Sequence, residues 1–288
     1  MMSITEDFKN AFRKPNNGLM QIIIINVIVF VVVLMLDLLL PQALYVNIYR
    51  QLALPAKISE FLYKPWTLIT YSFTHDMSDF LHILFNMLTF YWFGKLIEEY
   101  LGNRRLINIY MLGGLAGGVL FLICYNTIPY FVANQSPGVV GSSGAVYAVV
   151  IGAATLMPNY TFFLFLIGPV RIKYIAAVII LLSLIQSRQN PGGNFAHLGG
   201  ALLGYIYVTQ LKKGVDIAQP LRNFWSSFQK LFARKRKMQV TYRKAVASSA
   251  EYPSEDEVDR ILDKINRSGY ESLTKEEKQK LFQFSQKN

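Results

Sequence analysis

The chain has 288 residues, of which 52% are hydrophobic and only 16% are charged, and its 29 basic residues outnumber its 18 acidic ones. Soluble domains carry about 25% charged residues, so this composition argues against a soluble enzyme and indicates a membrane protein. The single cysteine, Cys124, excludes an intramolecular disulfide and a cysteine-based zinc site.

Six apolar segments predict six membrane-spanning helices. The first, residues 21–40, carries Asp37 as its one charge and is long enough, at about 1.5 Å per residue, to cross the roughly 30 Å hydrocarbon layer. It lacks a small-residue cleavage site, so we expect it to stay in the mature protein. The other spans are expected at residues 80–97, 106–125, 142–157, 172–185 and 195–211. The predicted fold class is an all-α membrane protein, with a six-helix bundle at residues 21–211 after an N-terminal segment at residues 1–20.

The fifth span has an interrupted start. Gly168-Pro169 splits the apolar run, and proline ends regular segments. We therefore place the span after the proline and Phe162–Ile167 at the membrane interface.

The distribution of Lys and Arg predicts the orientation. With six spans both termini face one side, and that side holds eight basic residues against four, before the tail is counted. The eight are Lys9, Arg13, Lys14, Lys95, Arg104, Arg105, Arg171 and Lys173, and the four are Arg50, Lys57, Lys64 and Arg188. Residues 212–244 add ten basic residues and one acid. By the positive-inside rule, both termini are expected in the cytoplasm.

The segment at residues 212–253 is predicted to be a basic amphipathic helix and linker. Apolar residues follow Pro220 at helical spacing, namely Leu221, Phe224, Trp225, Phe228, Leu231 and Phe232. The basic run Arg234–Lys237 comes next, so we expect residues 221–237 to lie on the anionic leaflet. A soluble tail helix or a nucleic-acid patch is the alternative, and the nearby membrane span argues against nucleic acid.

Residues 254–288 are predicted to form a small helical hairpin. Ser254 with Glu257, and Thr274 with Glu277, match capping boxes, and Gly269 marks the turn. The expected apolar face comprises Val258, Ile261, Leu262, Ile265, Leu281 and Phe282. A hairpin this small is not expected to be stable alone, so we expect it to dock on a partner.

Polar residues gather in the first turns of the second, fourth and sixth spans, which all run from outside to inside. These turns hold His82 and Asn86, the Gly141–Gly144 stretch, and His197. Polar groups inside a membrane are functional candidates by default. If Ser143 and His197 approach within hydrogen-bond reach, Ser143 could act as a nucleophile and His197 as its general base. His82 and Asn86 are four residues apart on one helix face, where both could donate to an oxyanion.

Small residues at four-residue spacing predict close helix packing that would bring Ser143 to His197. They are Gly144, Ala148 and Gly152 in the fourth span, and Gly200 and Gly204 in the sixth.

Other interpretations of these residues fit less well. Taken alone, the glycine-serine stretch is typical of a turn, and Ala145 stands where a hydrolase nucleophile elbow requires glycine. His75, His82 and His197 could in principle bind a metal, but no carboxylate completes such a site, so no metal or other cofactor is expected. The fourth and sixth spans also lack a carboxylate for a triad. A Ser/His dyad remains.

Together these residues resemble the rhomboid family of intramembrane serine proteases over about residues 65–211. The shared motifs are His-x-x-x-Asn at His82 and Asn86, Gly-x-Ser-Gly at Gly141–Gly144, and Ala-His-x-Gly-Gly with a later glycine at Ala196, His197, Gly199, Gly200 and Gly204. The resemblance implies that Ser143 is the nucleophile and His197 the base, with an oxyanion hole formed by His82, Asn86 and the Ser143 N–H. Tyr147 would stack on His197, and Gly141, Gly144 and Gly200 would support the site. Thr67 stands where the family often has arginine, which puts the anchoring of that loop in question.

The expected function is therefore cleavage of transmembrane segments of membrane proteins near the outer interface. The substrate helix must unwind there, because its carbonyls are otherwise bonded within the helix. The expected location is a bacterial inner membrane, and the tail from Ser254 is similar to a module of some Bacteroidota-type rhomboids. A catalytically silent, client-binding rhomboid-like scaffold is the alternative, and a transporter would need a polar path through the midplane. The sequence leaves the oligomeric state unpredicted.

Overall fold

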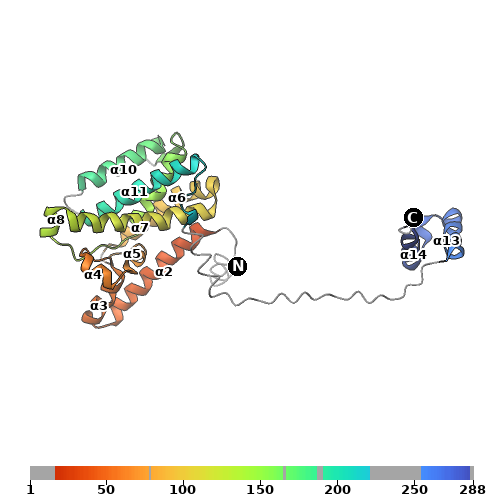
Figure 1. Ribbon diagram of the computed structural model, residues 1–288, viewed down its shortest axis with the longest axis horizontal. Coiled ribbons are helices and arrows are strands. Elements are labelled where there is room, and N and C mark those ends of the chain that lie inside the picture. The colour runs from red at the N-terminus through yellow and green to blue at the C-terminus, as the bar shows by residue number, and fades with distance from the viewer. Residues whose placement is uncertain (1–16, 78, 165–166, 187–190, 221–253, 286–288) are drawn as a thin grey trace. The chain divides into compact units, whose positions relative to one another are not determined.

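The computed structural model describes residues 17–77, 79–164, 167–186, 191–220 and 254–285. The chain divides into two compact units, residues 1–229 and residues 230–288 (Figure 1). The first unit is a bundle of helices with one short β-hairpin, and the second holds a pair of helices.

The first unit begins with a long helix and three short ones, in the order α2 (Gly18–Leu39), α3 (Gln42–Leu52), α4 (Ile58–Tyr63) and α5 (Thr67–Thr70). The next helices are α6 (Phe80–Leu101), α7 (Asn103–Thr127), α8 (Pro129–Ala133) and α9 (Ser143–Leu156). Strands β1 (Thr161–Leu164) and β2 (Gly168–Arg171) precede helices α10 (Ile172–Gln186) and α11 (Pro191–Lys212).

Each predicted span coincides with a helix, but the helices run past the apolar residues. Helix α6 continues to Leu101 and α7 begins at Asn103, whereas the sequence predicts spans at residues 80–97 and 106–125. Gly102 separates the two helices with a φ of 85°, a conformation that glycine adopts without strain. Among the described helices, α2, α6 and α7 are long and apolar enough to cross a membrane, and α9 and α10 are shorter apolar helices. The count of six spans stays a prediction.

The β-hairpin is one element that the all-α prediction does not include, in a fold that is otherwise helical, and the interfacial placement of Phe162–Ile167 stays a prediction. Thr161 pairs with Arg171 and Leu164 with Gly168 in an antiparallel register. The sequence Thr-Phe-Phe-Leu favours a strand, because β-branched and aromatic residues fit a pleated surface. Pro169 is tolerated in β2 because each strand of a two-stranded sheet is an edge strand, so the missing N–H costs nothing. Proline thus delays the start of α10 to Ile172, as the sequence predicts.

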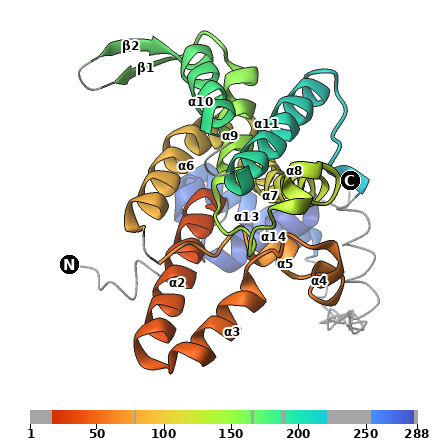
Figure 2. The ribbon, with the colours of Figure 1, turned by 90° about the vertical axis from the view of Figure 1, so that its left-hand side faces the viewer.

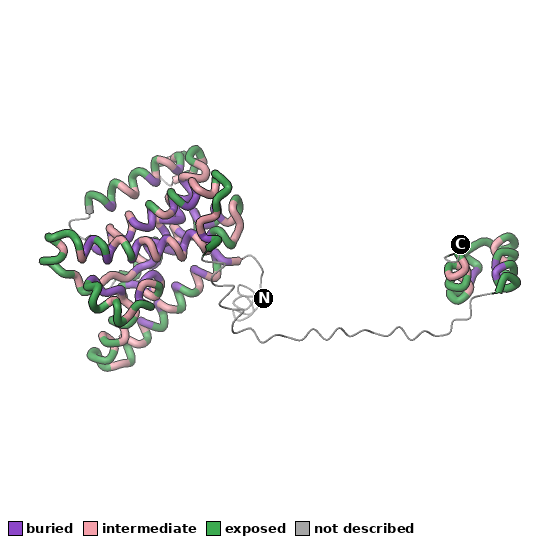
Figure 3. Tube along the Cα trace, viewed as in Figure 1, coloured by how far each residue is buried: buried purple, intermediate pink, exposed green. Residues whose placement is uncertain are grey.

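Helix α9 lies at the centre of the bundle, with α6, α10 and α11 around it (Figure 2). Its residues between Ser143 and Ala154 are nearly all buried, and they join one core with buried residues of α2, α6, α7, α10 and α11. Figure 3 shows the buried stretches of the first unit turned toward the inside of the bundle. Close backbone contacts hold α11 against it. A Cβ added at Gly200 would collide with the Gly144 carbonyl oxygen, and one at Gly204 would collide with that of Ala148. The small residues therefore set the distance between α9 and α11.

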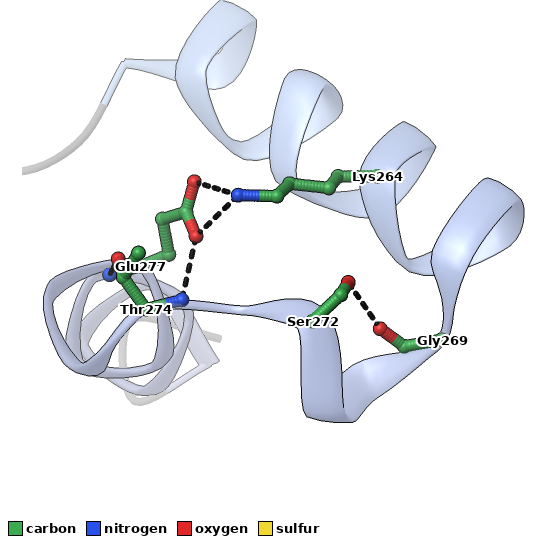
Figure 4. A network of polar contacts seen from close by, with 5 residues as sticks. All are labelled: Lys264, Gly269, Ser272, Thr274 and Glu277. Atoms are coloured by element: carbon green, nitrogen blue, oxygen red, sulfur yellow. Dashed lines mark hydrogen bonds and ion pairs between the residues drawn. The ribbon is translucent and has the colours of Figure 1, made fainter.

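The second unit contains α13 (Glu255–Ser268), the 3₁₀ turn η1 (Tyr270–Ser272) and α14 (Lys275–Ser285). Gly269, with a φ of 78°, ends α13 as predicted. Thr274 and Glu277 form a reciprocal capping box, in which each backbone N–H donates to the other residue's side chain (Figure 4). Glu277 also accepts from Lys264 Nζ at 2.9 Å, which ties α14 to α13 (Figure 4).

The apolar face predicted for this hairpin is partly wrong. Val258 and Ile261 are buried, together with Leu273, which the sequence analysis does not include. Leu262 and Phe282, by contrast, are 47% and 62% exposed. Two short helices share only one narrow seam, so Leu262, about 100° around the helix from Ile261, cannot reach it. The predicted amphipathic helix at residues 221–237 lies outside the described residues.

Candidate active site

Ser143 is the first residue of α9, where the chain turns sharply into the helix. Gly141, with a φ of 131°, makes this turn, and its N–H donates to the Tyr71 carbonyl at 2.9 Å. A side chain at Gly141 would be strained by that φ and would meet the His82 ring at 3.3 Å. The N–H groups of a first helical turn lack intrahelical partners, and the helix dipole adds positive potential there. Ser143 therefore sits where negative charge is favoured.

His197 lies within hydrogen-bond reach of Ser143, as the motif spacing predicts. The Ser143 Oγ and His197 Nε2 atoms are 2.7 Å apart, across the interface of α9 and α11. The close approach depends on glycine, because a Cβ at Gly144 would lie 3.0 Å from the Ala196 carbonyl oxygen. Ala196, the residue before His197, therefore lies directly against Gly144, the residue after Ser143. Gly200 packs on the Gly144 carbonyl in the same way.

Tyr147 stacks on the His197 ring. The ring centroids are 4.2 Å apart and the planes differ by 13°. Tyr147 is one turn after Ser143, so the helix that carries the serine also carries the surface that supports the histidine.

Ser183, on α10, contacts the far side of the same histidine, and the sequence analysis did not identify it. Its Oγ is 3.3 Å from His197 Nδ1 and donates to the Tyr147 hydroxyl at 2.9 Å. The Ser183 side chain is buried. When His197 Nε2 accepts from Ser143, Nδ1 carries the proton and donates to Ser183 Oγ, so all three contacts agree with one tautomer. A single serine in the apolar run of α10 was the signal that could have found it.

His82 and Asn86, both on α6, lie next to this group. The Asp79 side chain accepts from the His82 N–H at 3.1 Å and so caps α6 just before the pair. The Asn86 side chain is buried, and its Nδ2 has no hydrogen-bond partner within the described part of the chain. A buried donor left unpaired costs free energy, so binding of a hydrogen-bond acceptor at Asn86 Nδ2 would be favourable.

A cavity of about 370 Å³ opens beside these side chains. His82, Asn86 and Tyr147 line it, together with Ile179 of α10. Phe85, Thr89, Val146 and Val150 contribute to its walls. The cavity is mostly apolar and has a few polar groups on one wall, which is the usual make-up of a substrate pocket.

Ser142, the neighbouring serine, faces a different histidine. Its Oγ is 3.0 Å from His75 Nε2, and both side chains are fully buried. Burial, with a further contribution from His82, lowers the pKa of His75 to about 4, so His75 is neutral at pH 7. Neither group meets solvent, and the hydrogen bond between them ties the turn before α9 to the loop that carries His75. This second Ser/His pair therefore holds the turn in place. The sequence analysis considered His75 only as a metal ligand and did not foresee this contact.

Two further residues bear on earlier expectations. Thr67 is buried and donates to the Lys64 carbonyl at 2.6 Å, and Trp66 Nε1 donates to the Gln51 carbonyl at 2.9 Å. These bonds tie the loop around Thr67 internally without an arginine.

In the described parts of the chain, no group of three or more His, Cys, Asp and Glu side chains is placed to hold a metal ion.

Comparison with known proteins gives two matches along the chain. Residues 63–213 match the Rhomboid domain family, and residues 249–287 match a family of unknown function, DUF6576. The prediction of a Bacteroidota-type rhomboid stays a prediction.

Individual relatives come from plants, yeast and bacteria. RHOMBOID-like protein 12, mitochondrial, of Arabidopsis thaliana is 35% identical over 161 residues, which cover 51% of this chain and 47% of the relative. Rhomboid protein 1, mitochondrial, of Saccharomyces cerevisiae is 28% identical over 153 residues, 52% of this chain and 43% of the relative. Rhomboid protease GlpG of Haemophilus influenzae is 30% identical over 145 residues, 49% of this chain and 67% of the relative. The chain spans about half the length of the plant and yeast relatives that it matches.

Proposed function

The chain belongs to the rhomboid family, and from this we propose that it is an intramembrane serine endopeptidase that cleaves transmembrane segments of membrane proteins. The observation that carries the proposal is the 2.7 Å contact between Ser143 Oγ and His197 Nε2. Such a contact is the geometric requirement for a nucleophile activated by a general base.

In the proposed reaction His197 Nε2 takes the Ser143 hydroxyl proton as Oγ attacks the scissile carbonyl carbon. The carbonyl oxygen becomes an oxyanion, which the Ser143 N–H, Asn86 Nδ2 and the His82 ring are proposed to stabilise. His197 then gives its proton to the leaving amine, and the peptide bond breaks to leave an ester on Ser143. Water, deprotonated by His197, hydrolyses that ester and restores both residues.

Tyr147 and Ser183 are proposed to position His197 for these steps. The imidazolium that forms on proton transfer can donate from Nδ1 to Ser183 Oγ. The Ser183 hydroxyl in turn donates to the Tyr147 hydroxyl. The Tyr147 ring restricts the histidine to one plane. Here a hydroxyl performs the orienting role that a carboxylate performs in a triad.

The cavity lined by His82, Asn86 and Tyr147 is the proposed site of the unwound substrate segment. It borders the oxyanion donors on one side and Ile179 of α10 on the other, which supports entry between α6 and α10. A peptide there must already be extended, because helical carbonyls are bonded within the helix and shielded from attack.

The finer architecture is also a proposal. We propose six spans within residues 21–211, termini in the cytoplasm and the Ser143 layer near the outer face of a bacterial inner membrane. The excess of basic residues on the N-terminal side supports this orientation. Mitochondrial relatives make the inner membrane of an organelle the competing location.

A catalytically silent scaffold that binds membrane clients is the second candidate. It would use the same fold, but a scaffold does not need a hydroxyl and an imidazole at hydrogen-bond distance. Among the described residues Asn86 Nδ2, beside that pair, has no hydrogen-bond partner, which supports an enzyme, because a substrate oxygen that accepts from it would remove the cost of the unpaired donor.

Labelling with a serine-directed fluorophosphonate separates the two candidates. The chain should be labelled at Ser143, and Ser143→Ala and His197→Ala should each abolish both labelling and cleavage of a model transmembrane substrate. Ser142→Ala is the matched control, since its hydroxyl faces His75, and it should remain reactive. Cleavage by purified Ser143→Ala at the wild-type rate would refute the proposal.

A further inference from the structure

A cavity of about 530 Å³ lies between the connection from α2 to α6 and the loop after α8. Basic side chains dominate its lining, because Arg50, Lys57 and Lys64 border it and Glu60 is its one acidic residue. Ala53, Pro55, Ala56, Gln135, Ser136 and Pro137 complete the wall. The cavity is remote in sequence from Ser143 and His197, and none of the residues assigned to catalysis lines it.

Acidic side chains are few around the three cations: Glu60 lines the same cavity, and Asp76 borders a neighbouring cavity together with Arg50. In the part of the chain that the structure describes, Arg50, Lys57 and Lys64 form no ion pair and no side-chain hydrogen bond. With Glu60 the lining carries a net charge of +2, from three positive side chains and one negative. Unpaired like charges gathered at one concave site attract an anion.

The cavity is held in shape by contacts on both sides. Leu54 and Val139 exchange two backbone hydrogen bonds, of 3.0 and 2.9 Å, which join the two loops. On the next stretch of chain, Asn126 accepts from the Ile58 N–H at 3.2 Å and donates to the Ala56 carbonyl at 2.8 Å. Lys57 and Lys64 stand at the two ends of α4, so the same short helix sets the spacing of their backbone positions.

Apolar and aromatic side chains stand exposed around this charged cavity. On α4, Ile58 is 50% exposed, Leu62 70% and Tyr63 83%, and on α8, Tyr130 is 65% exposed (α4 and α8 are shown in Figure 2). Apolar residues with tyrosine at the edge of a membrane domain are typical of the headgroup layer of a bilayer. A free soluble anion would need no such rim, whereas a phospholipid offers a phosphate and acyl chains together.

We propose that this cavity binds the phosphate of an anionic phospholipid headgroup, with Arg50, Lys57 and Lys64 around the phosphate and the exposed face of α4 against the acyl region. The net charge of +2 favours an anionic headgroup over a zwitterionic one. Three of the four basic residues that the sequence places on the side opposite the termini thereby have a common role. The site goes beyond the proposed protease function and does not depend on it.

Native mass spectrometry of the full chain in detergent tests the proposal, with phosphatidylglycerol and phosphatidylcholine as the probes. The test variant is Arg50→Gln/Lys57→Gln/Lys64→Gln. The control variant, Lys95→Gln/Arg104→Gln/Lys213→Gln, removes three exposed charges elsewhere, and both keep the basic tail. One basic residue near an anionic headgroup is worth about fivefold in binding, so the test variant should bind phosphatidylglycerol at least about tenfold more weakly. The control and Ser143→Ala should bind as the wild type does.

Three other outcomes would overturn the lipid assignment. Equal losses in the test and control variants would mean that bulk charge, and no particular site, attracts the lipid. Full displacement of phosphatidylglycerol by millimolar inorganic phosphate would identify a free anion as the ligand. Unchanged lipid binding, with slower cleavage only of substrates that carry acidic residues outside their membrane segment, would identify an acidic peptide. Equal melting temperatures, and retention of binding by Lys57→Arg/Lys64→Arg, would exclude misfolding as the cause of a loss.

Discussion

Ser183→Ala removes a hydroxyl that lies 3.3 Å from His197 Nδ1 and 2.9 Å from the Tyr147 hydroxyl. The Ser183 side chain is buried, so its loss leaves the Nδ1–H facing apolar neighbours. A neutral hydrogen bond contributes about 0.5–1.5 kcal/mol, and a buried donor left unsatisfied costs about 1–3 kcal/mol. Since about 1.4 kcal/mol corresponds to a tenfold change in rate, we expect kcat/KM to fall about tenfold.

The loss should appear mainly in kcat, because Ser183 touches the base and does not line the substrate cavity. Cleavage of a fluorogenic transmembrane substrate in detergent measures kcat and KM separately. The pH–rate profile of the variant should also move, since the group that orients the titrating imidazole has changed. Ser72→Ala is the matched control, because Ser72 is also a buried serine, and its hydroxyl donates to the Ile69 carbonyl instead of contacting the histidine.

A double-mutant cycle sharpens this test. Tyr147→Phe keeps the ring that stacks on His197 and removes the hydroxyl that accepts from Ser183. The effects of Ser183→Ala and Tyr147→Phe should therefore be less than additive, because both break one chain of hydrogen bonds. Wild-type kcat and pH profile in Ser183→Ala, or a loss equal to that of Ser72→Ala, would refute a positioning role.

Three more predictions concern the oxyanion donors, the helix packing and the hairpin. Asn86→Ala should lower kcat about 10²- to 10³-fold with little change in melting temperature, and an unchanged kcat would exclude Asn86 from the oxyanion hole. Gly200→Ala should destabilise the bundle by about 1–3 kcal/mol or more, measured by thermal unfolding in detergent, because its Cβ meets the Gly144 carbonyl oxygen; a neutral effect would contradict the contact. Lys264 lowers the pKa of Glu277, mainly by donating a hydrogen bond to its carboxylate. That stabilisation is present above the ordinary glutamate pKa of 4.5 and is lost as pH falls through the lower folded pKa, so hydrogen-exchange protection of residues 255–285 should drop below pH 4.5. Glu277→Gln should weaken this dependence, and the Glu257–Lys280 pair should keep the remainder.

Much of the candidate site could be predicted from the sequence because its residues belong to short motifs. His82 and Asn86 share a helix face by their spacing, and Ser143 follows the glycine that the turn requires. The pairing of Ser143 with His197, 54 residues apart, could also be anticipated, because small residues at regular spacing predict where two helices touch.

The residues that were missed have no motif around them. Ser183 is a single serine in an apolar helix, and its contact with His197 depends on which way α10 faces. His75 lies in a loop, and its bond to Ser142 depends on how that loop folds back under the start of α9. The β-hairpin at residues 161–171 was missed because an apolar run split by proline is compatible with strand, helix or loop.

The sequence by itself determined that this is a membrane protein and where its apolar helices lie. It also determined that Ser143 stands two residues after the turn glycine Gly141. These properties depend on composition and on neighbours within one helical turn. Only the tertiary structure decided that Ser142, next to Ser143, faces His75, since adjacent residues at a helix start point in directions about 100° apart. Tertiary packing likewise brought Ser183 to His197 and gathered three basic residues of the connection from α2 to α6 around a cavity. Hydrogen bonds and charge clusters act over a few ångströms in space, and distance along the chain does not report that proximity.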